Sequence, residues 1–240
     1  RNMAPLRIAC FHSFRMSSGC LRKQMSEFSN FAASLGEQVE FRYLDGLHRC
    51  PPEKEAQMPE RLKTLLPPPY FEWWNARESD DGAVSYDGEA ATLAHVTDFM
   101  QREGPFDGVL GFSQGGSLAH LLCMVQEHDK ARGLPAFRFA IILSARVTRA
   151  PERAPLLAAS RQQPIRLPTL LIYGGGDNEV PAAMTRELRD TFDPACVTEV
   201  FLPEGKHRVP MLPPAEAACC RAFVGRFAGA TGPDAVRAAM

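Results

Sequence analysis

The sequence predicts an α/β fold with a mostly parallel central sheet and helices on both of its faces. Two observations support this prediction: short runs that are apolar throughout, and intervening segments whose apolar residues recur every three or four positions. Strands that are apolar throughout are typical of a parallel sheet buried on both sides, and the helices between them supply that cover. The 45% hydrophobic content is ample for the large core that such a fold needs.

The expected strands are, in chain order, Leu6–Phe11, Val39–Leu44, Gly108–Phe112, Phe137–Leu143, Thr169–Tyr173 and the weaker Thr198–Leu202. A first helix is expected to carry Leu21, Met25, Phe28, Ala32 and Leu35 on one face, and Gly36 to end it. Later helices are marked by Leu93, Val96 and Met100, by the run Ser117–Val125, by Met184, Leu188 and Phe192, and by Ala217, Cys220, Val224 and Phe227. Pro181 and Pro213-Pro214 precede the last two, because proline fits the first turn of a helix.

Residues 6–228 are expected to form a single domain, with residues 1–5 and 229–240 as tails. Two segments interrupt the alternation of strands and helices: a Pro-rich, aromatic insertion at about 47–82 and a basic, Pro-punctuated stretch at 146–168. The first is too long and too aromatic for a plain connection, and we expect both segments over the carboxyl edge of the sheet, where such sheets bind ligands. The insertion holds an aromatic cluster that predicts a substrate pocket, with surface packing as the alternative: Tyr70, Phe71, Trp73 and Trp74.

Composition narrows the classes of function. The chain has 240 residues, and 27 basic against 28 acidic residues leave a net charge of −1, which gives no support for nucleic-acid binding. No apolar stretch is long enough to span a membrane. The seven cysteines are odd in number and lack a CxxC pair, and the six histidines are dispersed, so we expect no metal site. Together with the absence of an apolar leader, this predicts a cytoplasmic protein; the sequence does not predict its oligomeric state.

The most informative motif is Gly111-Phe112-Ser113-Gln114-Gly115, a G-x-S-x-G between an expected strand and an expected helix. That context is typical of a nucleophile elbow, in which the serine sits on a strained turn and the glycines avoid side-chain clashes. The helix that follows points its N-terminus, with free N–H groups, toward the site. The alternative is a glycine-rich turn with an incidental serine.

In this arrangement the acid and the base follow the serine along the chain. Asp177 comes just after an expected strand and is the favoured acid, with Glu179 as the rival. His207 is the only histidine after Asp177, so it is the expected base. The alternatives are a helix-capping carboxylate and an exposed loop histidine.

An oxyanion hole needs two backbone donors. One is expected to be the N–H of Gln114, and the other the N–H of Phe14 in the loop after the first strand, with Ser13 as the alternative. His12 ends the first strand and is expected to line the site.

These residues resemble the FSH family of serine hydrolases, which are small α/β-hydrolases. The resemblance covers roughly residues 6 to 228, and its most specific element is the run Gly104–Gly116. It further rests on His12, Tyr43-Leu44-Asp45-Gly46, Trp73-Trp74-Asn75-Ala76, Asp177 and Gly205-Lys206-His207-Arg208-Val209-Pro210. It implies an α/β-hydrolase fold with strand order 2-1-3-4-5-6, and esterase or thioesterase activity without a cofactor.

The sequence therefore predicts a serine esterase or thioesterase with a catalytic triad of Ser113, Asp177 and His207. It would cleave small-molecule esters or thioesters of apolar acyl chains through an acyl-enzyme intermediate. The alternatives are an enzyme similar to acyl-protein thioesterases and a non-catalytic binding module of the same fold.

Overall fold

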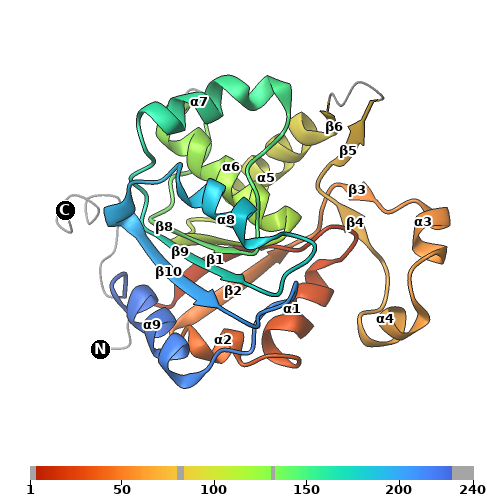
Figure 1. The fold of residues 1–240 in the computed structure, drawn as a ribbon, viewed down its shortest axis with the longest axis horizontal. Coiled ribbons are helices and arrows are strands. Elements are labelled where there is room, and N and C mark those ends of the chain that lie inside the picture. Colours follow the sequence, from red (N-terminus) through yellow and green to blue (C-terminus); the bar gives the residue numbers. More distant parts are fainter. Residues whose placement is uncertain (1–3, 80–83, 131–132, 229–240) are drawn as a thin grey trace.

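A computed structural model describes residues 4–79, 84–130 and 133–228. Its central feature is a six-stranded sheet with the order β10-β9-β8-β7-β1-β2, in which all neighbouring strands are parallel (Figure 1). The strands are β1 (Leu6–Phe11), β2 (Val39–Leu44), β7 (Gly108–Phe112), β8 (Phe139–Leu143), β9 (Thr169–Gly174) and β10 (Val197–Leu202). Counted within this sheet the order is 2-1-3-4-5-6, which confirms the predicted order and fold class.

Helices cover both faces of the sheet, as the sequence predicted (Figure 1). The helices on one face share a hydrophobic core with the sheet; they are α5 (Glu89–Glu103), α6 (Gln114–His128), α7 (Ala154–Gln162) and α8 (Ala182–Arg189). The helices on the other face share a second core with the sheet; they are α1 (Ser18–Ser26), α2 (Phe31–Ser34) and α9 (Pro214–Gly225). Among the described residues, no helix has the length and apolar character that crossing a membrane requires.

The first predicted helix is in fact two helices. Asn30 lies between α1 and α2, and its side-chain amide donates to Leu212 O at 2.8 Å and accepts from Leu212 N at 2.7 Å. This pairing with a residue 182 positions away draws the chain out of the helix. Phe28, predicted to face the core, is consequently 45% exposed.

The stretch at 146–168 is more ordered than the expected loop. It contains a 3₁₀ turn, η2 (Pro151–Arg153), followed directly by α7. A second 3₁₀ turn, η3 (Pro194–Cys196), precedes β10. Of the predicted tails, residues 1–3 and 229–240 lie outside the described residues, and so do residues 80–82 of the predicted insertion.

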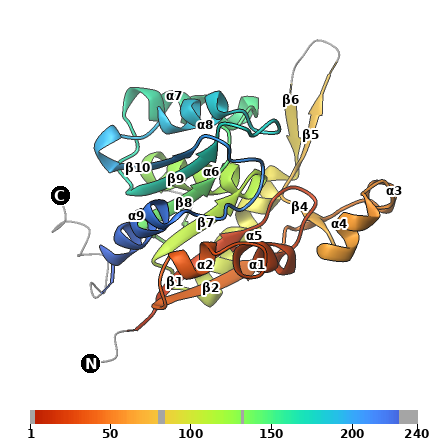
Figure 2. The ribbon, with the colours of Figure 1, turned by 60° about the horizontal axis from the view of Figure 1, so that its bottom comes forward.

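The insertion at 47–82 forms a small unit beside the sheet. It holds β3 (His48–Arg49), α3 (Pro52–Ala56), α4 (Glu60–Leu65), β4 (Phe71–Glu72) and β5 (Asn75–Glu78), and β5 pairs with β6 (Val84–Asp87). Figure 2 shows α3 and α4 projecting away from the sheet on one side, with the paired strands β5 and β6 projecting above them. A separate small core with Cys20, Cys50, Leu66 and Tyr70 holds this unit together.

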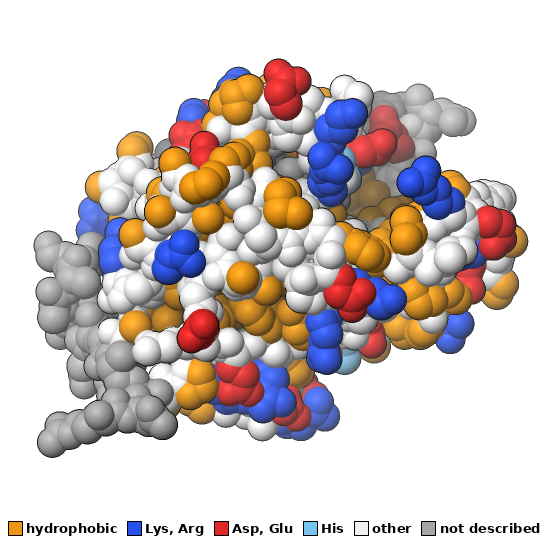
Figure 3. Space-filling view, turned by 90° about the horizontal axis from the view of Figure 1, so that it is seen from below, with side chains coloured by type: hydrophobic (Ala, Val, Ile, Leu, Met, Phe, Trp, Pro, Cys, Tyr) orange, Lys and Arg blue, Asp and Glu red, His pale blue; other side chains and the backbone are white. Residues whose placement is uncertain are grey.

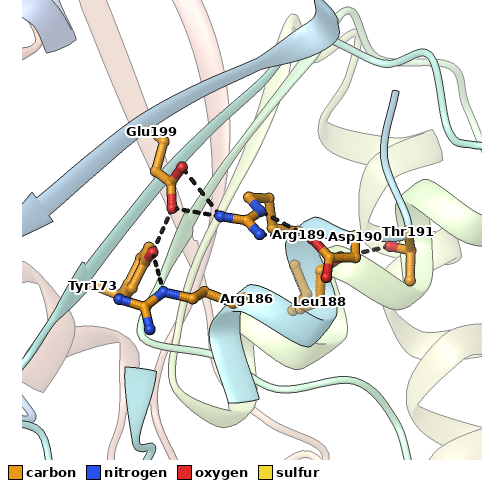
Figure 4. A network of polar contacts seen from close by, with 7 residues as sticks. All are labelled: Tyr173, Arg186, Leu188, Arg189, Asp190, Thr191 and Glu199. Atoms are coloured by element: carbon orange, nitrogen blue, oxygen red, sulfur yellow. Dashed lines mark hydrogen bonds and ion pairs between the residues drawn. The ribbon is translucent and has the colours of Figure 1, made fainter. Parts of the chain in front are cut away.

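A polar network fastens α8 to the edge of the sheet (Figure 4). The Tyr173 hydroxyl on β9 donates to Glu199 on β10, and Arg186 Nε on α8 donates to the same hydroxyl at 3.2 Å. Arg189 binds Glu199 and the adjacent Asp190 through its guanidinium. The network therefore joins the two elements that flank the loop with Asp177, β9 before it and α8 after it.

The fully buried His120 on α6 is expected to make the folded protein less stable in acid. It is fully buried, its Nε2 lies 2.8 Å from Thr191 Oγ1, and burial lowers its pKa to about 3. Below about pH 6.5 the unfolded chain binds a proton that the folded protein does not, so this histidine makes stability fall as pH falls toward 3.

We expect His120→Gln to lessen the fall by up to about 1.4 kcal/mol per pH unit between about pH 6 and 4. Urea unfolding of both proteins at several pH values measures this difference. Parallel curves for the two proteins would contradict it.

Candidate active site

Ser113 lies on a strained turn between β7 and α6. Its φ of 56° and ψ of −116° are outside the usual regions for a residue with a side chain. A Cβ at Gly111 would overlap the backbone of Gly115, and a Cβ at Gly115 would overlap the carbonyl oxygens of Phe11 and His12. The two glycines therefore allow the turn to pack against the end of β1. The Ser113 amide donates to Leu143 O on β8 at 2.9 Å, which ties the turn to the sheet.

The loops after β9 and β10 bring Asp177 and His207 to Ser113. His207 Nε2 lies 2.9 Å from Ser113 Oγ, and His207 Nδ1 lies 2.8 Å from Asp177 Oδ2. The two loops are joined by a hydrogen bond from Gly176 N to Gly205 O at 3.0 Å. Residues separated by 94 positions along the chain thus form one continuous hydrogen-bonded chain of side chains.

Asp177 is held firmly in this arrangement. Its side chain is fully buried, and Oδ1 accepts from the amides of Glu179 and Val180 at 3.0 and 2.8 Å. These bonds leave Oδ2 for the imidazole. Glu179, the rival acid of the sequence analysis, is exposed.

The two predicted backbone donors are the amides of Phe14 and Gln114. Within the described residues, neither the Phe14 nor the Gln114 amide has a hydrogen-bond acceptor. Gln114 opens α6, whose first N–H groups carry partial positive charge. Phe14 lies in the turn after β1, next to Arg15, which has a φ of 52°.

His12 is fully buried, and burial lowers its pKa to about 4. Its Nε2 accepts from Gly46 N at 2.9 Å, and its Nδ1 lies 2.7 Å from Ser13 O. Its ring stacks on Trp73 with 4.8 Å between centroids. Both ring nitrogens are therefore engaged by backbone atoms, which favours a packing role for His12 over the predicted role in lining the site.

The predicted aromatic pocket residues are mostly buried. Tyr70 belongs to the small core of the insertion, and its hydroxyl donates to Leu66 O at 2.6 Å. Trp73 and Trp74 are 0% and 3% exposed and belong to the core above the sheet. Phe71 is the one of the four that is partly exposed. This burial favours the packing alternative for the other three.

A cavity of about 360 Å³ lies at the carboxyl ends of β8, β9 and β10, behind the His207 loop. Ser144, Tyr173, Lys206 and Arg208 contribute to its lining, and none of the predicted pocket residues does. Figure 3 shows a hollow between the body of the molecule and the side where Figure 1 places α3 and α4, with basic side chains at its border.

Three groups around the site were missed by the sequence analysis. Glu72 is 3% exposed and accepts from Arg15 Nε at 2.7 Å. The Gln114 side chain binds the backbone of the two tryptophans, and Thr92 donates to Trp73 O. The sequence offered one signal, the quartet Glu72-Trp73-Trp74-Asn75, which places a charged residue next to two large aromatic ones.

Comparisons with known proteins find similarity to this chain in sequence and in fold. The model of the family described as "Serine hydrolase (FSH1)" matches residues 3–218. The chain is 29% identical to human "Esterase OVCA2" over 236 residues, which cover 93% of this chain and 97% of that protein. Among solved structures, maize acyl-protein thioesterase 2 is similar with a TM-score of 0.60 and 18% identity, covering 94% of this chain and 96% of that one. The esterase PE8 is similar with a TM-score of 0.57 and 20% identity, covering 93% of both chains.

Proposed function

Because the chain belongs to the FSH1 serine hydrolase family, we propose that it cleaves carboxylic esters or thioesters through an acyl-enzyme formed on Ser113. The observation that carries this proposal is the chain Ser113–His207–Asp177, with distances of 2.9 and 2.8 Å, at a serine with positive φ. Strain at a functional residue is the expected mark of a serine raised above the sheet edge.

In the proposed reaction Ser113 Oγ attacks the acyl carbonyl carbon while His207 Nε2 takes the hydroxyl proton. The C=O electron pair moves onto oxygen and returns as the leaving group departs with the proton from His207. A water molecule then attacks the acyl-enzyme carbonyl while His207 takes its proton, and the bond to Ser113 Oγ breaks as His207 returns that proton to the serine, which releases the carboxylic acid. Asp177 holds the imidazole with its proton on Nδ1 and stabilises the imidazolium.

The developing oxyanion would accept from the free amides of Phe14 and Gln114. Each such donor contributes about 10²–10³ in rate, because it acts where the negative charge forms. The two amides come from the loops after β1 and β7, which are neighbours in the sheet.

The proposed substrates are small-molecule esters or thioesters with apolar acyl chains, and the proposed reaction needs no cofactor. The names of the relatives, an esterase and an acyl-protein thioesterase, support both leaving groups without choosing between them. The seven free thiols support the proposal of a reducing compartment such as the cytoplasm.

Labelling with a fluorophosphonate probe tests the proposal directly, because the probe bonds covalently to an activated serine. We expect one label per chain, at Ser113, together with turnover of p-nitrophenyl esters or acyl thioesters. Absence of both would favour a non-catalytic binding module.

The value of kcat/KM is expected to rise with acyl length from acetate through medium chains. Each methylene that becomes buried contributes about 0.8 kcal/mol, which is about a fourfold gain at most. Phe71 is the predicted pocket aromatic that is still accessible, so Phe71→Ala should flatten the rise more than it lowers acetate cleavage.

A series of p-nitrophenyl esters of graded length measures this rise. Phe28→Ala is the matched control, since Phe28 is an exposed aromatic residue between α1 and α2. A flat wild-type profile would reject the apolar acyl preference.

A further inference from the structure

Four residues of the insertion, Phe71–Trp74, contact both halves of the proposed oxyanion hole. This 71–74 segment comprises β4 and the two tryptophans after it. We propose that the 71–74 segment, acting mainly through Glu72 and the Gln114 side chain, positions the two oxyanion-binding amides. The inference rests on the proposed function and adds positioning residues to it.

The segment fastens the loop after β1 at both ends and in the middle. The Phe71 amide donates to Met16 O at 2.7 Å, and Trp73 Nε1 donates to His12 O at 2.7 Å. Between these two anchors, Arg15 Nε donates to Glu72 Oε1 at 2.7 Å. Phe14, whose amide is the proposed donor, lies between these anchors.

The middle contact explains a strained residue. Arg15 has a φ of 52°, a conformation that is unfavourable for a residue with a side chain. Its guanidinium stacks over the Phe14 ring at 4.6 Å and binds the carboxylate of Glu72, which is 3% exposed. A buried carboxylate that meets a guanidinium in this way offsets the strain and fixes the turn at Phe14.

The same segment holds the second half of the hole. Gln114 Oε1 accepts from Trp73 N at 3.1 Å, and Gln114 Nε2 donates to Trp74 O at 2.8 Å. The Gln114 side chain thus accepts one hydrogen bond and donates another, and together these bonds fix the position of the residue that follows Ser113. The Trp73 carbonyl in turn accepts from Thr92 on α5. The loop after β1 and the start of α6 are thus both bound to the 71–74 segment.

The two residues that follow β2, Asp45 and Gly46, support the 71–74 segment. Gly46 donates its amide to His12 Nε2, and a Cβ at Gly46 would approach Glu72 O to 2.6 Å. Asp45 Oδ1 accepts from Ser18 N at 2.6 Å at the start of α1. The Asp45-Gly46 pair therefore lets the 71–74 segment lie flat against the loop it positions.

Glu72→Ala tests the inference, with kcat/KM measured on an oxygen ester and on its thionoester, in which sulfur replaces the carbonyl oxygen. Amide donors placed for a small oxyanion favour oxygen over the larger sulfur, which is a weaker acceptor. We expect Glu72→Ala to lower kcat/KM on the oxygen ester by about 10- to 100-fold. This is less than the loss expected when an oxyanion donor is removed entirely, because the amides are displaced and not deleted. The ratio of oxygen ester to thionoester should fall about tenfold, and kcat should change more than KM.

Glu72→Gln keeps an acceptor for Arg15 Nε and should restore most of the ratio. Arg15→Ala removes the other partner at a side chain that is 27% exposed, so it keeps the fold and should lower the ratio as well. Asp107→Ala is the matched control. Asp107 binds Arg138 at 3.0 Å and the Arg7 amide at 3.0 Å at the amino ends of the strands, so its loss should lower stability and leave the ratio unchanged.

Equal losses on both esters in Glu72→Ala and Arg15→Ala would overturn the inference, because a merely structural role slows both reactions alike. An unchanged rate in the two variants would overturn it as well. Neither result affects the proposed function, which depends on labelling and turnover that require Ser113.

Discussion

Replacement of Ser113 by alanine is expected to lower kcat/KM on any ester that the protein cleaves by about 10⁴-fold or more. The variant loses the attacking oxygen, while the amides of Phe14 and Gln114 stay in place. Covalent labelling by a fluorophosphonate should disappear completely. Initial rates at enzyme concentrations high enough to detect the residual turnover measure the loss.

Ser144→Ala is the matched control for this substitution. Ser144 directly follows β8, is 4% exposed and has a φ of 42°, so it is a buried serine that shares the positive φ of Ser113. Its loss should leave turnover and labelling close to the wild-type values. Near-normal activity in Ser113→Ala would show that a different residue is the nucleophile.

Asp177→Asn is expected to cost up to about 10⁴-fold in kcat. The amide is similar in shape to the carboxylate, but an NH₂ group facing His207 Nδ1 favours the tautomer with its proton on Nε2. That tautomer cannot take the Ser113 proton, and the imidazolium loses its counter-charge. Because the imidazole is needed as a base, the loss should persist across neutral pH.

Glu179→Gln separates the two candidate acids. Glu179 is exposed and accepts no bond from His207, so its substitution should change kcat by less than about twofold. Pre-steady-state measurement of acylation in both variants compares them at the step where His207 acts as base. The reverse ranking would identify Glu179 as the acid.

The sequence predicted the parts of the fold that depend on local patterns. β1 and β2 have the predicted bounds, because each is a short run rich in apolar residues. The elbow was recognisable because its glycines and its serine lie within five residues. His207 could be chosen because no other histidine follows Asp177.

What could not be predicted depends on contacts between distant residues. The break between α1 and α2 comes from Asn30 binding Leu212, which no periodicity shows. The aromatic residues of the insertion look the same in a sequence whether they line a pocket or fill a core. Trp73 is buried because Phe11 and His12 contact its ring, and the Gln114 side chain binds its amide from 41 positions away.

His207 follows β10, which lies at the edge of the sheet and pairs with β9 alone. Free energies of local opening differ across a protein, and an edge strand with one partner opens more readily than the centre of a sheet. Ser113, in contrast, follows β7, which has a neighbour on each side. Detachment of β10 alone would therefore separate the imidazole from the serine while the middle of the sheet stayed folded, so we expect inactivation to begin at this edge strand.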